Sequence, residues 1–357
     1  MSNVKVALWG FGAMGQGIAR SLLGKKGVEI TGVCDINPAI VGKGILEVLG
    51  ASSGGNSEQK DVKIVTAIEE AVPPKSCDVC ILATDSFTAK AFPKMETLIK
   101  LGVNVITSAE EMAYPSANEP ELTKKLDELA KAHGVSVLGT GINPGLVMDL
   151  LALCLSGAMT DVTSVMCKRV NSLSPFGPTV MEEQGVGITV DEFNKGVASG
   201  TLAGHVGFAE SVGMIADGMG LEIDEFRQQM EPIVTTVDRK SPYGFAAAGH
   251  LAGVNMTGQG LKDGKVVIDM LHPQQIEPEM EGTHTGDYIV LQGNPPISMQ
   301  ITPEIDGGIG TIAMCINCIP QVINADAGVI TMLDIPVPRA IMGDFRPLIK
   351  AGKKIVC

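Results

Sequence analysis

The first 145 residues alternate short apolar runs with segments of helical periodicity. The apolar runs predict six strands, at residues 4–9, 28–34, 62–65, 78–83, 103–107 and 135–139. Apolar residues that recur every three or four positions predict helices at about 14–23, 87–101 and 119–133. Apolar strands that alternate with helices are typical of a parallel sheet covered on both faces. Residues 1–145 are therefore predicted to form a doubly wound, Rossmann-type α/β domain.

The pattern changes after Pro144. A helix at about 145–156 and a strand at 162–170 are followed by a glycine- and proline-rich loop that we expect to reach about residue 187. Helices are then expected at 190–199 and 205–219, and strands at 232–238, 250–258, 266–271, 288–293 and 297–302. Strands without intervening helices indicate a mixed or antiparallel sheet, so residues 146–307 are predicted to form an α+β domain for substrate binding and oligomerisation. Residues 308–357, beginning with a helix at 308–327, are expected to pack back on the first domain.

Composition narrows the possible partners. Hydrophobic residues make up 45% of the 357 residues and charged residues 19%, which is enough apolar material for globular cores. The formal net charge is −13, and an acidic surface repels phosphate backbones, so we expect no nucleic-acid partner. The most apolar stretch, 146–159, carries Asp149 and is too short to span a membrane. We expect a cytoplasmic protein that forms a homodimer or homotetramer.

The eight cysteines include two C-x-x-C pairs, a spacing that can indicate zinc or redox chemistry. Cys77 and Cys80 stand at the start of a buried strand, where residues three apart point to opposite faces and cannot chelate one ion. Cys315 and Cys318 lie in an apolar segment expected to be helical. Neither pair has the glycine-rich turn of a zinc knuckle, so we predict free, buried thiols and no metal site.

The sequence G-F-G-A-M-G at residues 10–15 carries the clearest chemical signal. It follows a predicted strand and opens a predicted helix, which is the context in which G-x-G-x-x-G binds a dinucleotide. Gly10 permits the tight turn, Gly12 lets the backbone approach the pyrophosphate, and Gly15 lets the helix pack against the strand. The helix N-terminus faces the phosphate charge. We predict a nicotinamide dinucleotide held by Gly10, Phe11, Gly12, Ala13, Met14 and Gly15.

Asp35 stands 20 residues after Gly15, at the end of the second predicted strand. A carboxylate there accepts hydrogen bonds from the adenosine ribose and repels the 2′-phosphate of NADP. No arginine follows closely in D-I-N-P-A-I-V-G-K, so NAD is favoured, while Lys43 leaves NADP possible. The alternative is a structural turn beside an unrelated surface aspartate. The strand–loop–helix context favours the cofactor.

Polar residues follow the carboxyl ends of the fourth, fifth and sixth predicted strands, where a doubly wound sheet binds its ligands. The fourth strand ends in Ala83 and is followed by Thr84 and Asp85, the fifth is followed by Ser108, Glu110 and Glu111, and the sixth is followed by Asn143. Ala83, Thr84 and Ser108 are expected to contact the cofactor, and Asn143 the substrate. Asp85, Glu110 and Glu111 are candidates for a catalytic acid or base acting on an amine. The alternative for each acid is a solvated loop carboxylate.

The second domain offers further candidates. Lys168 and Arg169 sit near an expected strand end and are suited to binding a substrate carboxylate. Glu182 and Glu183 lie in the expected glycine-rich loop and are suited to holding an amine. His205 begins an expected helix, and its ordinary pKa of about 6.5 makes it a candidate acid or base near neutral pH. A capping or core histidine is the alternative.

Three segments carry a resemblance to a known family, namely V-A-L-W-G-F-G-A-M-G, T-S-A-E-E-M-A-Y-P and G-T-G-I-N-P-G-L-V-M-D. With these segments the chain resembles the 2,4-diaminopentanoate dehydrogenases over most of its length. The N-terminal half is also similar to the 4-hydroxy-tetrahydrodipicolinate reductases, but it lacks their paired-histidine and lysine motif. The resemblance implies NAD(P)-dependent oxidative deamination of 2,4-diaminopentanoate in ornithine breakdown, giving 2-amino-4-oxopentanoate and ammonia.

Other functions stay open on the sequence. The enzyme alternatives are a dehydrogenase of another diamino acid and an oxidoreductase like the dipicolinate reductases or the homoserine or aspartate dehydrogenases. The non-enzymatic alternative is a regulatory protein that senses NAD without turnover. No helix-turn-helix or basic arm is visible, which disfavours a regulator that binds DNA.

Overall fold

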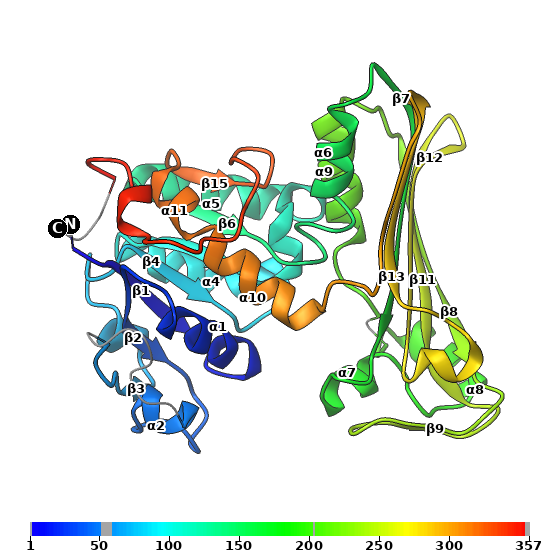
Figure 1. Cartoon of the computed structure of the whole chain (residues 1–357), viewed down its shortest axis with the longest axis horizontal. Coiled ribbons are helices and arrows are strands. Elements are labelled where there is room, and N and C mark those ends of the chain that lie inside the picture. Colours follow the sequence, from blue (N-terminus) through cyan, green and yellow to red (C-terminus); the bar gives the residue numbers. More distant parts are fainter. Residues whose placement is uncertain (1, 51–58, 203, 354–357) are drawn as a thin grey trace. The chain divides into compact units, whose positions relative to one another are not determined.

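The computed structural model describes residues 2–50, 59–202 and 204–353. The chain folds into two compact units, which Figure 1 shows with their elements labelled. The first unit comprises Met1–Gly145 and Gly307–Cys357, and the second comprises Leu146–Asp306. The segment from Gly307 onward is therefore part of the first unit and not a domain of its own.

A parallel sheet forms the centre of the first unit, with strand order β15-β6-β5-β4-β1-β2-β3. The chain starts at β1, moves outward to β3 and then continues from β4 on the other side of β1. This reversal is the topological switch point of a doubly wound fold, so the predicted fold class is confirmed. The strands are β1 (Val4–Trp9), β2 (Val28–Cys34), β3 (Ile64–Val65), β4 (Val79–Leu82), β5 (Asn104–Thr107), β6 (Ser136–Gly139) and β15 (Gly328–Ile330).

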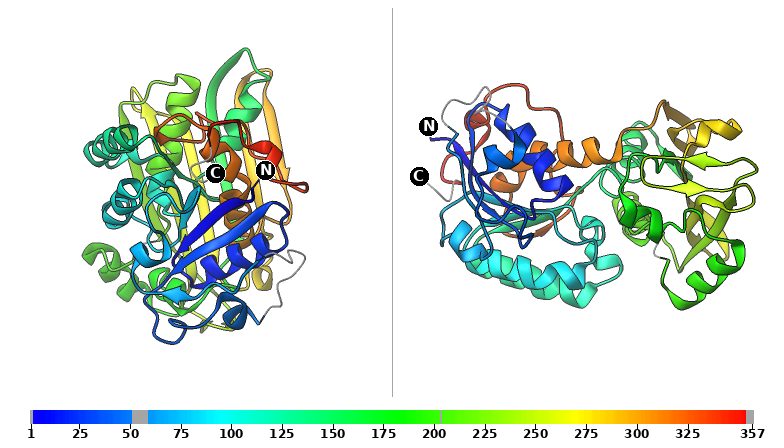
Figure 2. Two further views of the ribbon diagram at one scale, coloured as in Figure 1. Left: turned by 90° about the vertical axis from the view of Figure 1, so that its left-hand side faces the viewer. Right: turned by 90° about the horizontal axis from the view of Figure 1, so that it is seen from below.

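Helices cover both faces of this sheet. In the right-hand view of Figure 2, α4 (Thr88–Lys100) and α5 (Pro120–His133) lie on one side, and α1 (Ala13–Leu23) and α10 (Gly307–Asn317) lie on the other. The remaining helical elements of this unit are α2 (Ile45–Leu49), α3 (Ile68–Ala71), α11 (Ile319–Asn324), and the 3-10 turns η1 (Glu110–Ala113), η2 (Pro115–Ala117) and η4 (Arg346–Leu348).

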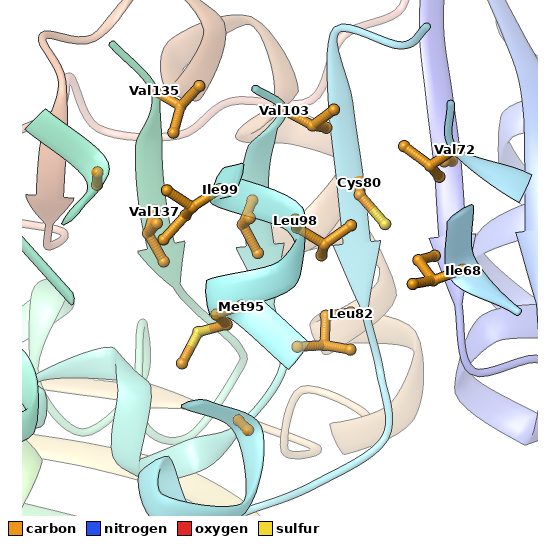
Figure 3. Packing of buried hydrophobic residues seen from close by; sticks show 14 of the residues in the cluster. Ile68, Val72, Cys80, Leu82, Met95, Leu98, Ile99, Val103, Val135 and Val137 are labelled. Atoms are coloured by element: carbon orange, nitrogen blue, oxygen red, sulfur yellow. The ribbon is translucent and has the colours of Figure 1, made fainter. Parts of the chain in front are cut away.

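The core of the first unit explains why α4 takes its place. Met95, Leu98 and Ile99 are fully buried on one face of α4 and pack with strand residues such as Cys80 and Val137 (Figure 3). Their spacing of three and four residues is the periodicity that predicted the helix. Burying one such side chain is worth about 1.5–3 kcal/mol relative to leaving it exposed.

The helix expected at 308–327 is interrupted. It divides into α10 and α11 at Cys318, because Pro320 in the first turn of α11 has no N–H with which to continue the α10 hydrogen-bond ladder. After α11 the chain forms β15, a three-residue strand that the sequence pattern did not predict. It pairs with β6 and extends the parallel sheet.

The second unit contains a six-stranded sheet of order β14-β13-β7-β12-β11-β8. The pair β7–β12 is parallel and the other neighbours are antiparallel, so the predicted mixed sheet is confirmed. The strands are β7 (Asp161–Ser172), β8 (Glu225–Val234), β11 (Leu251–Lys262), β12 (Lys265–Gln275), β13 (Gly286–Asn294) and β14 (Ile297–Ile301), with a ribbon of β9 (Arg239–Lys240) and β10 (Phe245–Ala246).

Two helices, α6 (Leu150–Ser156) and α9 (Phe208–Met219), cover one face of this sheet (Figure 1). The unit also contains α7 (Pro178–Glu183), α8 (Val190–Ser199) and the 3-10 turn η3 (Pro278–Glu281). The expectation of a continuous loop up to residue 187 is wrong, because a helix begins at Pro178. The start of β8 was also placed too late, since this exposed edge strand is too polar to show apolar alternation.

Candidate active site

The glycine loop after β1 has two glycines that the fold itself requires. Gly10 has φ of +97°, and a Cβ there would lie 2.5 Å from the carbonyl oxygen of Ala83. A Cβ on Gly15 would lie 2.0 Å from the carbonyl oxygen of Gly10. Gly12 differs, because a Cβ there would meet nothing within 4 Å, and its φ of −73° suits any residue. The space at Gly12 is thus kept open for a reason other than packing.

The N-terminus of α1 fits an anionic ligand. Gly12 is its N-cap, no side chain caps it, and its first turn contains no acidic residue. Gly12 and Ala13 are exposed, so main-chain N–H groups of the first turn face solvent. Such a helix end attracts phosphate. The side chain of Phe11, in contrast, is fully buried, so Phe11 shapes the loop from within.

Asp35 lies beside the glycine loop. Its Oδ2 accepts a hydrogen bond from the Phe11 N–H, and its Oδ1 accepts one from the Asn37 N–H at 2.7 Å. The carboxylate is half-buried, and the next residue, Ile36, is 84% exposed. A carboxylate fixed in this position, next to a loop suited to phosphate, fits the ribose of a dinucleotide. The residues present therefore fit the cofactor that the motif predicts.

Hydrogen bonds join the loops that follow the strands. The N–H of Ala83 donates to Trp9 O, and the N–H of Ser108 donates to Leu82 O. In the loop after β6, the Ile142 N–H donates to Thr311 Oγ1 of α10, and the adjoining Asn143 is half-buried. The polar residues expected at these strand ends are thus held at one edge of the sheet.

Asp85 is engaged in an ion pair. Lys94 Nζ lies 2.5 Å from Asp85 Oδ2, and Thr84 Oγ1 donates a hydrogen bond to the same oxygen. Burial favours the neutral acid, but the hydrogen bonds from Lys94 and Thr84 and the charges of Lys94 and Lys90 outweigh it and lower the pKa of Asp85. A carboxylate with a lowered pKa is a weak base. The structure therefore argues against Asp85 as the catalytic base.

Glu111 supports a helix. Its Oε2 accepts a hydrogen bond of 2.7 Å from the N–H of Thr88, the first residue of α4. Its own N–H donates to Ser86 O. Because an acidic group at a helix N-terminus stabilises the helix, Glu111 has a structural task. Glu110 is half-buried at the start of η1 and stays a candidate for the catalytic base.

Lys168 and Arg169 do not act as a pair. Both lie inside β7 and not near its end, so the expected position is wrong. Arg169 is only 2% exposed and donates to Asp287 Oδ1 at 2.5 Å and to Ile305 O at 2.6 Å. Lys168 lies over the Tyr288 ring, 5.8 Å from its centroid. Neighbouring residues of a strand point to opposite faces, so the two cations cannot hold one carboxylate.

Glu182 and Glu183 are exposed at the end of α7. They were expected in a loop, and the helix at this place corrects that expectation. An exposed helical carboxylate needs no ligand, so nothing in their surroundings favours an amine contact.

His205 lies ahead of α9 and does not begin it, since the helix starts at Phe208. Its ring stacks edge-on against His272 and Phe208, with centroids 4.7 and 5.0 Å away. Burial and the positive charge of Arg169 lower the pKa of His205 to about 3. Titration near neutral pH, expected from the sequence, is therefore wrong: the ring is neutral there.

Residues that the sequence reasoning missed surround His205. His272 Nε2 and Asn171 Oδ1 form a hydrogen bond of 3.0 Å, and Gln274 is the register partner of Asn171 across β12 and β7. Gln184 Nε2 donates to Gly204 O at 3.0 Å, next to His205. Arg169, Asn171, Gln184, His205, His272 and Gln274 are called the polar cluster below.

Three atoms of the polar cluster are buried without a hydrogen-bond partner among the described residues. They are His205 Nε2, Gln184 Oε1 and Gln274 Nε2. Leaving a buried polar atom unsatisfied typically costs about 1–3 kcal/mol, so such atoms indicate a place for water or a ligand. Together they offer one amide acceptor, one amide donor and an imidazole nitrogen, which accepts when the ring proton is on Nδ1.

A signal for the polar cluster is present in the sequence. On the buried face of β7, Val165 and Cys167 are followed by Arg169 and Asn171, and β12 changes in the same way to His272 and Gln274. Polar residues that continue a buried apolar face rarely serve packing alone, because burying them requires hydrogen-bond partners.

The two C-x-x-C pairs are buried as predicted. Burial raises the pKa of Cys77 and of Cys315 to about 12, so these thiols stay protonated. In the part of the chain that the structure describes, no group of three or more His, Cys, Asp or Glu side chains is placed to hold a metal. Likewise, no helix among those residues is long and apolar enough to cross a membrane. Cys357 lies outside the described residues.

Comparison with known proteins identifies the family. Residues 146–351 match the model of the 2,4-diaminopentanoate dehydrogenase C-terminal domain. The chain is also 59% identical to a 2,4-diaminopentanoate dehydrogenase of Acetoanaerobium sticklandii, over the full length of both proteins. The chain belongs to the 2,4-diaminopentanoate dehydrogenase family. It is accordingly an amino acid dehydrogenase of the NAD(P) type and not a regulator without turnover.

More distant relatives are amine dehydrogenases. One from Streptomyces virginiae is 23% identical, over 95% of this chain and 98% of that protein. The structure of an amine dehydrogenase from Mycobacterium smegmatis superposes with a TM-score of 0.83 at 25% identity, covering 96% of this chain and 98% of that one.

Proposed function

We propose that this member of the family catalyses the oxidative deamination of 2,4-diaminopentanoate to 2-amino-4-oxopentanoate and ammonia, with NAD as the preferred cofactor. The observation that carries the substrate assignment is the 59% identity over the whole of a curated 2,4-diaminopentanoate dehydrogenase. Such a reaction serves ornithine breakdown. Three groups of residues support it, and each has a separate task.

The first group holds the cofactor. The N–H groups at Gly12, Ala13 and Met14 receive the pyrophosphate, and Asp35 accepts from the ribose hydroxyls. Ala83, Thr84 and Ser108 lie at the strand ends beside the glycine loop, on the nicotinamide side. When bound, NAD accepts a hydride from the substrate carbon that bears the amine.

The second group is the polar cluster of the second unit, whose chemistry suits the amino-acid end of the substrate. The neutral His205 Nε2 and Gln184 Oε1 accept hydrogen bonds from the C2 ammonium. Gln274 Nε2 donates to the carboxylate. The three unpartnered atoms thereby gain partners, which supports a substrate that carries both groups.

The third element is Glu110, as general base. Its carboxylate removes a proton from the C4 ammonium, because only the neutral amine can release hydride from its carbon. Loss of hydride leaves a C4 iminium, and Glu110 releases its first proton to solvent. A water then adds to C4 while the carboxylate of Glu110 accepts a proton from that water. Glu110 then gives this proton to the nitrogen. The C4–N bond breaks as the C4 hydroxyl returns its proton to the Glu110 carboxylate, so that ammonia leaves and a carbonyl remains at C4.

Two substrates test the proposal. The enzyme is assayed with 2,4-diaminopentanoate and with pentan-2-amine, which keeps the carbon chain and the reacting amine but lacks the polar end. Reduced cofactor and ammonia are measured together. We expect both products in equal amounts from 2,4-diaminopentanoate and little turnover of pentan-2-amine.

The similarity to amine dehydrogenases favours a second candidate, a dehydrogenase of simple amines. Comparable turnover of pentan-2-amine would support it over the diamino acid assignment. Gln274→Leu separates the roles further, because it should raise the KM for 2,4-diaminopentanoate and leave the KM for NAD unchanged. If Gln274→Leu changes neither the KM for 2,4-diaminopentanoate nor the KM for NAD, the polar cluster is not part of the substrate site.

A further inference from the structure

A cavity of about 160 Å³ lies in the first unit, between α11 and the C-terminal segment that follows β15. This volume is close to that of an engineered protein cavity that binds benzene. The lining includes Pro320 and Gln321 of α11, and Pro336, Arg339, Ile341 and Leu348 of the C-terminal segment. None of these residues belongs to the glycine loop, the strand ends or the polar cluster.

Two asparagines that also line the cavity hold its walls together. Asn317 Oδ1 accepts from the Ile341 N–H at 3.1 Å. Asn324 Nδ2 donates to Leu348 O at 2.8 Å, and its Oδ1 accepts from the Lys350 N–H at 2.8 Å. These bonds fasten the C-terminal segment along α11, which makes the cavity a built feature of the fold.

Gln321 stands between these asparagines in sequence and lines the same cavity. Its Oε1 is buried and has no hydrogen-bond partner among the described residues. Asn317 and Asn324, in contrast, bond to backbone groups of the facing segment. An acceptor left in this state inside a cavity indicates a missing donor.

Arg339, an exposed residue, also lines the cavity and carries a positive charge. It forms no ion pair with any residue that the structure describes, whereas the neighbouring Arg346 is paired with Asp344 at 2.5 Å. Pro320, Pro336, Ile341 and Leu348 form apolar walls. The cavity thus combines a cation, an unsatisfied acceptor and apolar surface within the space of one small molecule.

We propose that this cavity binds an α-amino acid with a short apolar side chain, as an effector and not as a substrate. The guanidinium of Arg339 takes the carboxylate, and Gln321 Oε1 accepts from the ammonium. The prolines, Ile341 and Leu348 contact the side chain. Because α11 packs against β4, β5 and β6, and α10 packs against α1, a ligand here stabilises the elements that carry the cofactor site.

Three matched probes test the chemistry of the site. L-valine carries all three groups, 3-methylbutanoate lacks the ammonium, and 2-methylpropylamine lacks the carboxylate. Binding to the full-length enzyme, saturated with NAD, is measured by calorimetry and by the shift in Tm. We expect L-valine to bind and each truncated probe to bind at least about tenfold more weakly, since each loses a charge-assisted hydrogen bond.

Variants locate the binding. Arg339→Met and Gln321→Leu should each weaken L-valine binding by about tenfold or more. Lys350→Met, which removes an exposed charge from the same segment, serves as the control and should bind L-valine normally. All three variants should keep the wild-type kcat and the KM for NAD.

Three results would overturn the proposal. The first is no binding of L-valine at millimolar concentration, and the second is binding that Arg339→Met leaves unchanged, because the probe then occupies another site. The third is a change of oligomeric mass in Arg339→Met during sedimentation, which would make the cavity a contact between copies of the chain.

Discussion

The carboxylate of Asp35 accepts a hydrogen bond from the main-chain N–H of Phe11, which lies 24 residues earlier in the glycine loop. The end of β2 is thereby tied to the loop that follows β1. Its other oxygen is held by the Asn37 N–H. Asp35 therefore fixes the loop and presents a negative charge at the place expected for the ribose.

Because of this hydrogen bond, two substitutions of Asp35 should have different effects. Asp35→Asn keeps an oxygen acceptor for the loop and removes the charge, so we expect NADP use to rise while the loop stays in place. Asp35→Ser shortens the side chain and should also raise the KM for NAD. The kcat/KM values for NAD and NADP are measured for each. A wild-type enzyme that uses NADP as well as NAD would show that Asp35 does not read the ribose.

Gly12→Val should abolish cofactor binding and leave the fold intact. A Cβ at Gly12 meets no protein atom within 4 Å, so the side chain fills only the space expected for the pyrophosphate. Because Gly12 is the N-cap of α1, where valine is disfavoured, we expect a loss of stability of about 1 kcal/mol, which is too small to unfold the protein. Fluorescence titration with NADH and the Tm are the measurements. Gly15→Ala is the contrasting variant: its Cβ meets Gly10 O at 2.0 Å, so it should lower the Tm.

Glu110→Gln and Glu111→Gln should behave differently, although they alter neighbouring residues. Losing a positioned general base typically lowers the rate about 10²–10⁴-fold, and we expect this for Glu110→Gln, with NAD binding retained. Glu111→Gln keeps an acceptor for the Thr88 N–H and should change the Tm slightly and kcat little. Single-turnover kinetics with 2,4-diaminopentanoate distinguish the two. Near-normal turnover of Glu110→Gln would place the base elsewhere.

His205 makes the stability of the second unit sensitive to acid. Its pKa is lowered from an ordinary 6.5 to about 3, so between these values the unfolded chain binds a proton that the folded chain does not. This contribution to stability is complete above about pH 6.5 and is lost as the pH falls toward 3. His205→Asn should reduce the difference between the free energies of unfolding in urea at pH 7.5 and at pH 5. His133→Asn, at an exposed position, should leave this difference in the free energy of unfolding unchanged.

Chelators should leave turnover intact, because the proposed base is Glu110 and no group of metal ligands is placed together in the described ranges. Activity is measured after prolonged dialysis against EDTA. Loss of activity that zinc restores would contradict this mechanism and direct attention to Cys315 and Cys318, whose thiols lie close in sequence.

The fold of the first unit was predictable because its signals are local. The apolar runs at 4–9 and 28–34 coincide with β1 and β2, and α4 follows from its own apolar spacing. The glycine motif was likewise readable, since it lies in one short segment between β1 and α1. Where the local signal was weak, as in the polar edge strand β8 and the three-residue β15, the prediction failed.

Local sequence signals did not determine which of the candidate residues form the site. The sequence placed Asp85, Glu110 and Glu111 at strand ends, but only the fold brings Lys94 to Asp85 and the Thr88 N–H to Glu111. Arg169 likewise meets Asp287, 118 residues later, and Asn171 meets His272, 101 residues later. A pattern of apolar positions depends on neighbours along the chain, whereas the partner and the pKa of a side chain depend on strand register and packing between distant segments.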